Sequence, residues 1–183
     1  MYKRSILVCL LILLVGGVLS FTANAEWTIV VATMTDPPKM DGNAVDSFES
    51  GIATYNVYEP LLKYDPVDFI IKPYLATDWE ISKDAKSAIF HLRKKVKFQD
   101  GTNFNAEAVK FNYERTMALG YSPSALLEPI KEAKIIDEYT IKFTTKEPFA
   151  FWEENFASLK GLVIESPSYV KAHATENDPW AKK

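Results

Sequence analysis

The clearest hydrophobic pattern lies in the middle of the chain, where apolar and polar residues alternate. Phe90 and Leu92 alternate with polar neighbours, which predicts a strand with one packed face. The alternation resumes in the opposite phase at Val96 and Phe98. We therefore expect either a bulge near Lys94 or a strand face that slants toward solvent.

Four other stretches are also predicted to be strands. Residues Tyr139–Thr145 alternate between apolar and polar side chains and follow the stretch Lys134–Asp137, so the two predict a hairpin. Leu162–Ile164 is a short apolar run and predicts another strand. Trp27–Ala32 is apolar on both alternate faces, which is typical of a buried strand in a parallel sheet.

Helical spacing first occurs after Asp46. Phe48, Ile52 and Tyr55 recur at intervals of three and four residues, so they predict a helix that Pro60 ends. We expect these three apolar side chains to form its packed face.

A longer helix is predicted from Asn105 to Gly120. Asn105 is a suitable N-cap, Glu107 places a negative charge in the first turn, and Gly120 is a suitable end. Its expected packed face consists of Val109, Tyr113, Thr116 and Met117. A short aromatic-rich helix is also expected to start at Pro148, and another helix at Ser166-Pro167. Because helices and strands are interspersed, the pattern indicates an α/β or α+β fold.

The first 25 residues have the three-part pattern of a secretory signal peptide. Lys3 and Arg4 give a positive start, Ile6–Leu19 is an uncharged apolar run, and Ala23 and Ala25 are small residues at the expected cleavage site. The alternative is a membrane anchor, but the apolar run is shorter than the roughly 20 residues that span a bilayer. We expect cleavage after Ala25.

Composition excludes several classes of function. The formal net charge of the chain is -3, so it lacks the basic footprint of a nucleic-acid-binding protein. Its single cysteine cannot form an internal disulfide, and with two histidines, His91 and His173, the chain has too few ligands for a zinc site. The sequence contains no phosphate-binding glycine loop and no nucleophile elbow. We therefore predict neither an enzyme nor a bound cofactor or metal.

Candidate ligand contacts lie just after the first predicted strand. In open α/β sheets, ligands bind beyond the carboxyl ends of strands, and Met34, Thr35 and Asp36 occupy that place. Tyr55 and Tyr58, near the expected helix end, have apolar faces with a polar tip that suit a pocket wall. The alternatives are a plain turn at Asp36 and a core position for the tyrosines.

Eight segments of the chain match, in order, the sequence pattern of one family. They are Asn56–Leu62, Pro73–Ser82, Phe90–Lys94, Val96–Gly101, Phe104–Phe111, Arg115, Asp137–Ile141 and Glu147–Phe149. Together they resemble the family 5 extracellular solute-binding proteins, which are the dipeptide-, oligopeptide- and nickel-binding components of ABC importers. The chain departs from the family pattern at Ala85 and Lys95, where glycine is expected, and at Gln99, where histidine is frequent.

The resemblance implies a fold and a division into domains. The fold is the first lobe of a type II, cluster C periplasmic-binding protein, an α/β lobe with a mixed sheet and helices, and incomplete because family members are much longer. The implied domains are a signal peptide at 1–25, a first-lobe α/β subdomain at 26–60 and 150–183, and an inserted α+β subdomain at 61–149.

The same resemblance implies a function. A periplasmic protein of this kind captures peptides in a two-lobed clamp and delivers them to permease subunits in the inner membrane, and we expect a monomer. Three alternatives remain open: the same family with nickel, an oligosaccharide or another small solute as ligand; a truncated remnant without function; and a secreted enzyme.

Overall fold

The computed structural model describes residues 28–30, 32–158 and 160–181, and it divides into two compact units, residues 1–32 and 33–183. The predicted signal peptide and its cleavage site lie outside the described residues. In the first unit, Thr28, Ile29, Val30 and Ala32 form no strand, and Ile29 and Val30 are 86% and 85% exposed. The prediction of a buried strand at 27–32 is therefore wrong for its described residues, because a strand needs a neighbour for its backbone groups and none pairs with them.

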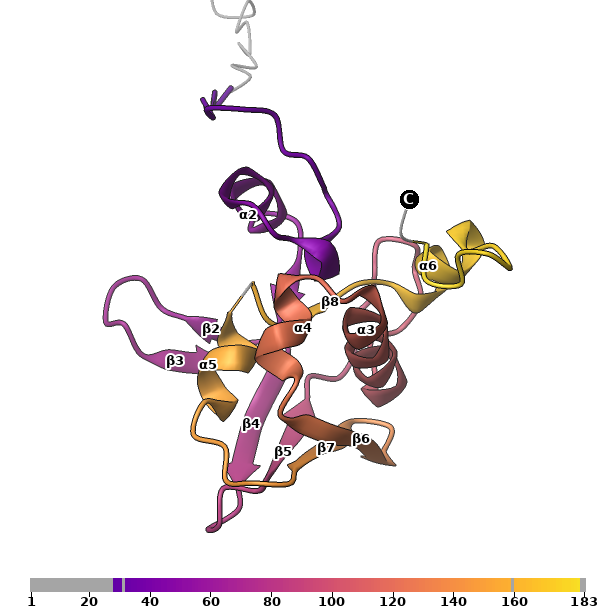
Figure 1. Cartoon of the computed structure of the whole chain (residues 1–183). Coiled ribbons are helices and arrows are strands. Elements are labelled where there is room, and N and C mark those ends of the chain that lie inside the picture. The colour runs from indigo at the N-terminus through magenta and orange to yellow at the C-terminus, as the bar shows by residue number, and fades with distance from the viewer. Residues whose placement is uncertain (1–27, 31, 159, 182–183) are drawn as a thin grey trace, which may run out of the picture. The chain divides into compact units, whose positions relative to one another are not determined.

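The second unit contains a four-stranded sheet (Figure 1). Its strands run in the order β4-β5-β7-β6, and each pair of neighbours is antiparallel. The strands are β4 (Ala76–Ile81), β5 (Ser87–Leu92), β6 (Ile130–Asp137) and β7 (Thr140–Thr145). The predicted hairpin is confirmed as β6 and β7, although β6 begins four residues earlier than its pattern indicated.

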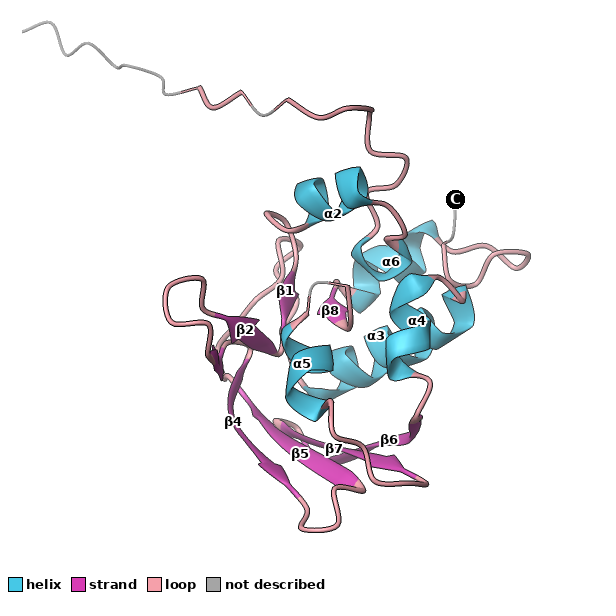
Figure 2. Cartoon of the chain, turned by 60° about the vertical axis from the view of Figure 1, so that its left-hand side comes forward, coloured by secondary structure: helices cyan, strands magenta, loops and turns pink. Residues whose placement is uncertain are grey.

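Alternation in β5 and β7 decides which face of this sheet is buried. Phe90 is directly opposite Ile141, and both side chains are fully buried. The polar positions between them, such as His91 and Lys142, point to the other face and are only partly buried. Figure 2 shows the helices α3, α4 and α5 on one side of the sheet, above the buried face.

Helix α3 (Ala106–Leu119) confirms the long helix predicted from the sequence. The Asn105 side chain accepts a hydrogen bond from the Ala108 backbone N–H at 3.0 Å, which satisfies one of the free donors of the first turn. Gly120 ends the helix in the left-handed region with φ 70°. Val109, Tyr113 and Thr116 are buried as predicted, and Met117 is partly buried against the core.

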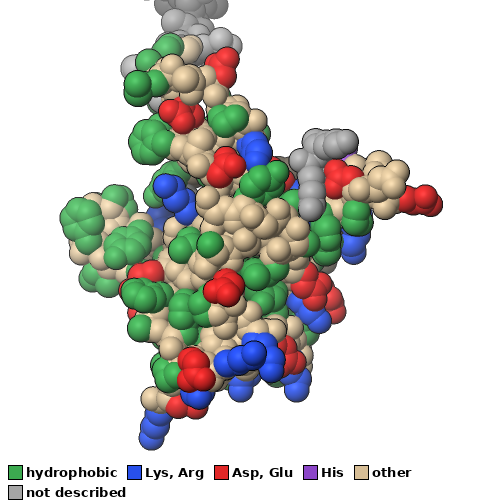
Figure 3. Space-filling model, viewed as in Figure 1, with side chains coloured by type: hydrophobic (Ala, Val, Ile, Leu, Met, Phe, Trp, Pro, Cys, Tyr) green, Lys and Arg blue, Asp and Glu red, His purple; other side chains and the backbone are tan. Residues whose placement is uncertain are grey.

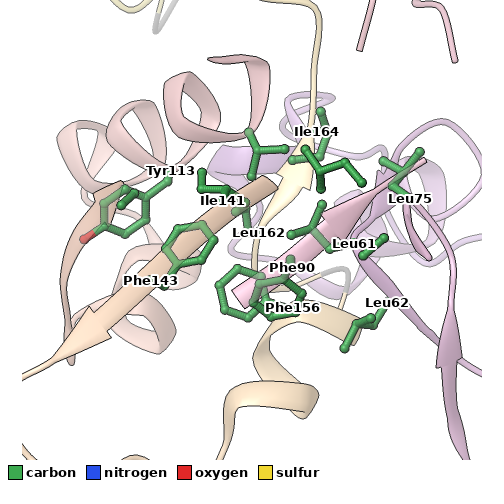
Figure 4. Packing of buried hydrophobic residues seen from close by; sticks show 14 of the residues in the cluster. Leu61, Leu62, Leu75, Phe90, Tyr113, Ile141, Phe143, Phe156, Leu162 and Ile164 are labelled. Carbon is green, nitrogen blue, oxygen red and sulfur yellow. The ribbon is translucent and has the colours of Figure 1, made fainter. Parts of the chain in front are cut away.

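The hydrophobic core joins the sheet to the short helices and strands of residues 61–75 and 152–164 (Figure 4). The rings of Phe90 and Phe143 pack against Phe156, with centroids 4.6 and 4.8 Å away. Phe156 and Trp152 belong to α5 (Trp152–Ala157), which begins four residues after Pro148. Leu61 and Leu162 are also fully buried. The proposed division between 61–149 and the flanking segments remains a prediction.

Two small antiparallel sheets complete the strands. β1 (Glu59–Pro60) pairs with β8 (Val163–Ile164), which confirms the strand predicted there, and β2 (Leu62–Tyr64) pairs with β3 (Ile71–Pro73). The turn between β2 and β3 carries exposed apolar side chains, with Val67 86% and Phe69 74% exposed. Figure 3 shows hydrophobic side chains gathered at the left edge of the molecule, where Figure 1 places this hairpin.

The remaining helices are short. They are the 3-10 helix η1 (Gly42–Ala44), α2 (Phe48–Thr54), α4 (Ser122–Leu127) and α6 (Pro167–His173). Ser166 caps α6 as predicted, because its side chain accepts a hydrogen bond from the Tyr169 backbone N–H at 3.3 Å. No helix in the described part of the chain is both long enough and apolar enough to cross a bilayer.

The helix predicted after Asp46 exists, but its predicted packed face is wrong. α2 ends at Thr54, well before Pro60, and its buried residues are Ser50 and Thr54. Phe48 is 72% exposed and Tyr55 61% exposed. Ser50 is turned inward by hydrogen bonding, since its side chain accepts from the Lys39 backbone N–H at 3.1 Å. A polar anchor therefore decides the orientation of this short helix.

The strand through Phe90 ends earlier than the alternation indicated. β5 stops at Leu92, and Lys95 lies in the left-handed region with φ 62°. The phase change near Lys94 thus marks a turn between two segments. Ala85 is also left-handed, with φ 54°, and its carbonyl accepts hydrogen bonds from the Phe149 backbone N–H and from Trp152 Nε1. Both positions are those where the family pattern favours glycine, which tolerates this conformation.

Replacing either residue by glycine is expected to stabilise the protein. Ala85→Gly and Lys95→Gly should each raise the free energy of unfolding by about 0.5–1 kcal/mol, because the strain of a left-handed Cβ exceeds the added chain entropy. Urea denaturation measures the change. Lys94→Gly is the matched control, since Lys94 is not among the residues with positive φ. An equal gain in the control would show that backbone strain is not the cause.

Candidate ligand-binding site

A cleft of about 1090 Å³ lies on the second unit, a size that suits a small solute. Most of its walls come from four segments that are distant in sequence, residues 38–41, 57–59, 96–100 and 164–166, together with part of α6; the lining also includes Ala44, Leu75, Phe104, Arg115 and Ala181. Apolar side chains such as Phe98 and Phe104 line one part, and charged groups such as Asp41, Arg115 and Glu165 line another. The cleft can therefore contact both the apolar and the polar parts of a ligand.

The charged wall is built around Arg115, in the third turn of α3. Its side chain is 2% exposed, and its guanidinium donates two hydrogen bonds to the Asp41 carboxylate, at 2.9 and 2.5 Å. The same group donates to Glu165 Oε2 at 3.0 Å, and Nε donates to the Trp180 carbonyl at 3.0 Å. The arginine thus connects the beginning and the end of the second unit.

Asp41 and Glu165, the two acidic partners of Arg115, have pKa values shifted in opposite directions. Burial acts to raise the pKa of Asp41, but its hydrogen bonds and charge interaction with Arg115 hold that pKa below the usual value. Burial and the neighbouring Asp41 charge raise the pKa of Glu165 to about 7. One guanidinium therefore keeps Asp41 ionised, while Glu165 competes for the same cation.

A buried amide network supports this wall from behind. The Asn112 carboxamide oxygen accepts from Asn43 Nδ2 at 3.1 Å and from the Glu165 backbone N–H at 3.1 Å, and its Nδ2 donates to the Glu165 carbonyl at 2.8 Å. Thr116 Oγ1 donates to the Asn43 side-chain oxygen at 2.8 Å. Because these hydrogen bonds link Asn43, Asn112, Thr116 and the Glu165 backbone, the network holds η1, α3 and the segment after β8 relative to one another.

The lining of the cleft also includes a second polar cluster, around Asp100 and Ser166. Asp100 accepts hydrogen bonds from the hydroxyls of Ser166, Ser168 and Thr102, and from the Thr102 backbone N–H at 2.9 Å. These bonds hold the pKa of Asp100 well below its usual value. The cluster joins the turn at 100–102 to the start of α6.

Of the five residues predicted to contact a ligand, one lines the cleft and four do not. Tyr58 lines the cleft, and its hydroxyl donates to the Met40 carbonyl at 2.9 Å. Burial, followed by the nearby Glu165 and Asp41 charges, raises the pKa of Tyr58. Met34, Thr35, Asp36 and Tyr55 are exposed and do not line this cleft. Whether any of the five contacts a ligand remains a prediction.

Sequence reasoning missed the charged residues of the wall. Asp41, Arg115 and Glu165 were not selected, although Arg115 was part of the family pattern. One signal was available, since Arg115 lies among the buried positions of α3, next to Thr116. An arginine at such a position requires acidic partners. The sequence did not indicate which of its 24 acidic residues these would be.

Comparison with known proteins identifies the family. The profile of the bacterial extracellular solute-binding proteins, family 5, middle region, matches residues 71–183. The chain belongs to this family. Family 5 members are binding proteins, and the predicted class of protein is confirmed.

Individual relatives agree with this assignment. The chain is 31% identical over 153 residues, 81% of its length, to the probable D,D-dipeptide-binding periplasmic protein DdpA of Escherichia coli K12. The periplasmic binding protein DppA of Helicobacter pylori, solved with the peptide STSA, superposes with a TM-score of 0.66 at 34% identity. NikA of Brucella suis, solved with Fe(III)-EDTA, superposes with a TM-score of 0.67 at 27% identity.

These matches confirm the predicted fold class and define how much of the relatives the chain represents. The superpositions cover 79% and 80% of this chain but 32% and 30% of DppA and NikA, and the match to DdpA covers 30% of that protein. The chain therefore spans about a third of the length of the relatives it matches. In the described residues, no group of three or more His, Cys, Asp or Glu side chains is placed to hold a metal ion.

Proposed function

We propose that this chain supplies most of the first lobe of a periplasmic solute-binding protein that captures peptides for an ABC importer. The observation that carries the proposal is the cleft of about 1090 Å³, lined by apolar and charged side chains, in a member of family 5. Relatives named as dipeptide- and glutathione-binding proteins support peptides as the solute class. Captured peptides would pass to permease subunits in the inner membrane.

Export and location are part of the same proposal. The basic start, the apolar run and the Ala23 and Ala25 positions support removal of a signal peptide after Ala25. The matched relatives DdpA and the nickel-binding protein are named as periplasmic. A monomer fits a clamp that closes on one solute between two lobes.

The proposal predicts weak binding at a defined place. A pocket normally encloses most of its ligand, and we expect this chain to supply one wall of the clamp, so di- to pentapeptides should bind more weakly than about 100 μM. Calorimetry with a mixed peptide library measures the affinity. Backbone amide shifts in NMR spectra at millimolar peptide should then occur around residues 57–59 and 164–166.

The control compares a tyrosine that lines the cleft with one that does not. Tyr58→Ala should reduce the peptide-induced shifts, because Tyr58 lines the cleft. Tyr64→Ala should leave them unchanged, because Tyr64 lies on β2 and is 45% exposed. Shifts confined to other surfaces, or equal effects of the two variants, would contradict the proposed site. Micromolar binding of a peptide would contradict the expectation that this chain supplies one wall of the clamp.

A further inference from the structure

Two carboxyl groups share one cation in the wall of the cleft. Glu165 and Asp41 both accept hydrogen bonds from Arg115, and their side chains are 10% and 26% exposed. Among the described residues, Arg115 is the one cation that forms an ion pair with either carboxyl group. With both carboxyl groups ionised, this poorly solvated cluster carries one excess negative charge, which is costly at low dielectric.

The cluster connects three parts of the chain. Asp41 caps η1, Arg115 belongs to α3, and Glu165 follows β8. Glu165 forms a direct bridge to η1, because its Oε1 accepts from the Gly42 backbone N–H at 3.0 Å while its Oε2 accepts from Arg115. The space around Gly42 is tight, since a Cβ there would lie 2.6 Å from Val163. A small movement of the Glu165 side chain should therefore move the backbone of η1 at Gly42.

The other ionisable groups around the cluster do not provide a second cation. Tyr58 faces both carboxyl groups, and burial raises its pKa, so it stays neutral. Lys39 is paired with Asp46 at 3.3 Å and lies over the Tyr121 ring. On α6, His173 Nδ1 is within hydrogen-bonding distance of the Tyr169 carbonyl, at 2.8 Å. Lys97, Glu59 and Asp100 also line the cleft; in the described part of the chain Lys97 forms no ion pair with Asp41 or Glu165, and Asp100 accepts hydrogen bonds from hydroxyl groups.

We propose that Asp41 and Glu165 form a proton-operated lock between η1 and the segment after β8. One proton on Glu165 removes the excess charge and allows the two carboxyl groups to share a hydrogen bond. When this proton is lost, two carboxylates share one guanidinium, and the contact between η1 and the segment after β8 is weakened. Because the lock lies in the wall of the cleft, the shape of the cleft would change with pH.

The direction of the effect follows from the pKa of Glu165, which burial and the Asp41 charge raise to about 7. A carboxyl group with a raised folded-state pKa contributes stability below its unfolded value of 4.5, and this contribution is lost as pH rises toward 7. Asp65, Asp84, Asp100 and Asp137 have lowered pKa values, so they stay ionised above pH 5 and add no opposing slope.

Thermal unfolding of the full chain at pH 5 and pH 8 tests the lock. The unchanged chain should lose about 5 °C in Tm between these conditions. Glu165→Gln should lose much less between the two pH values, because glutamine is neutral at both; its one carboxamide oxygen can replace one of the two Glu165 acceptors, toward Gly42 or toward Arg115. Glu147→Gln is the matched control, since Glu147 is 87% exposed, and it should keep the original pH profile. Equal pH profiles for the unchanged chain and Glu165→Gln would overturn the proposal.

Two measurements on the unchanged chain test the lock without the Glu165→Gln variant. In a ¹³C NMR titration, the Glu165 carboxyl should titrate near neutral pH, and titration near its ordinary value would overturn the proposal. Hydrogen exchange at Gly42 should show lower protection at pH 8 than at pH 5, after correction for intrinsic exchange. Unchanged protection at Gly42 would show that the proton does not act on η1. Neither result depends on solute binding, so failure here is distinguishable from failure of the proposed function.

Discussion

Arg115→Met is expected to lower the free energy of unfolding by about 3–5 kcal/mol. Methionine retains much of the apolar stem but removes the guanidinium that pairs with Asp41 and Glu165. The buried carboxyl groups then lose their cation, and the Trp180 carbonyl loses its donor. Urea denaturation followed by circular dichroism measures the loss, and a chain that no longer folds meets the same expectation.

The control for this prediction is Arg93→Met. Arg93 is exposed and donates one hydrogen bond to the Tyr74 carbonyl at 2.9 Å, so its loss should cost less than about 1 kcal/mol. Adding Glu165→Gln to Arg115→Met should recover part of the stability, because one unpaired charge disappears. A loss below 1 kcal/mol for Arg115→Met would contradict the role assigned to the cluster.

Phe90→Ala should also destabilise the protein by about 3–5 kcal/mol. The Phe90 ring is fully buried between the sheet and α5, and its centroid lies 4.6 Å from Phe156 and 6.0 Å from Phe143. Removing it leaves a cavity between side chains that are held by strands and a helix. Chemical denaturation measures the effect.

Phe48→Ala provides the comparison for Phe90→Ala. Phe48 is 72% exposed at the start of α2, so its replacement should change the free energy of unfolding by less than about 0.5 kcal/mol. Similar losses for the two variants would mean that the core does not lie between β5 and α5.

Elements whose signals are local could be predicted from the sequence. The α3 cap at Asn105 and its end at Gly120 depend on hydrogen bonds and backbone angles within a few residues. The alternation in β7 depends only on the two-residue period of a strand, and it correctly placed Ile141 and Phe143 in the core. The same applies to the Ser166 cap of α6.

Elements that need a distant partner were predicted less well. The stretch at 27–32 is apolar enough for a strand, but its described residues have no neighbouring strand. The apolar spacing of Phe48 and Tyr55 indicated a packed face, whereas the bond from the Lys39 backbone N–H to Ser50 turned the opposite side inward. In each case the local pattern correctly identified apolar side chains, but it could not show which other segments of the fold lie next to them.

The candidate site depends almost entirely on distant contacts. Arg115 lies 74 residues from Asp41 and 50 from Glu165, so no local spacing connects them. Tyr58 could be selected because its residue type suits a pocket wall, but the cleft beside it requires four separate segments to meet. Only the tertiary structure could show that two acids share one arginine.

The sequence by itself determined the α3 and α6 caps, the β6–β7 hairpin and the resemblance to family 5, because each of these is written in short-range spacing or in an ordered set of short segments. The tertiary structure alone decided which side of α2 is buried, where β5 ends, and which acids surround Arg115. Burial and charge pairing depend on the whole surroundings of a side chain, and those surroundings are assembled from residues that the linear pattern does not bring together.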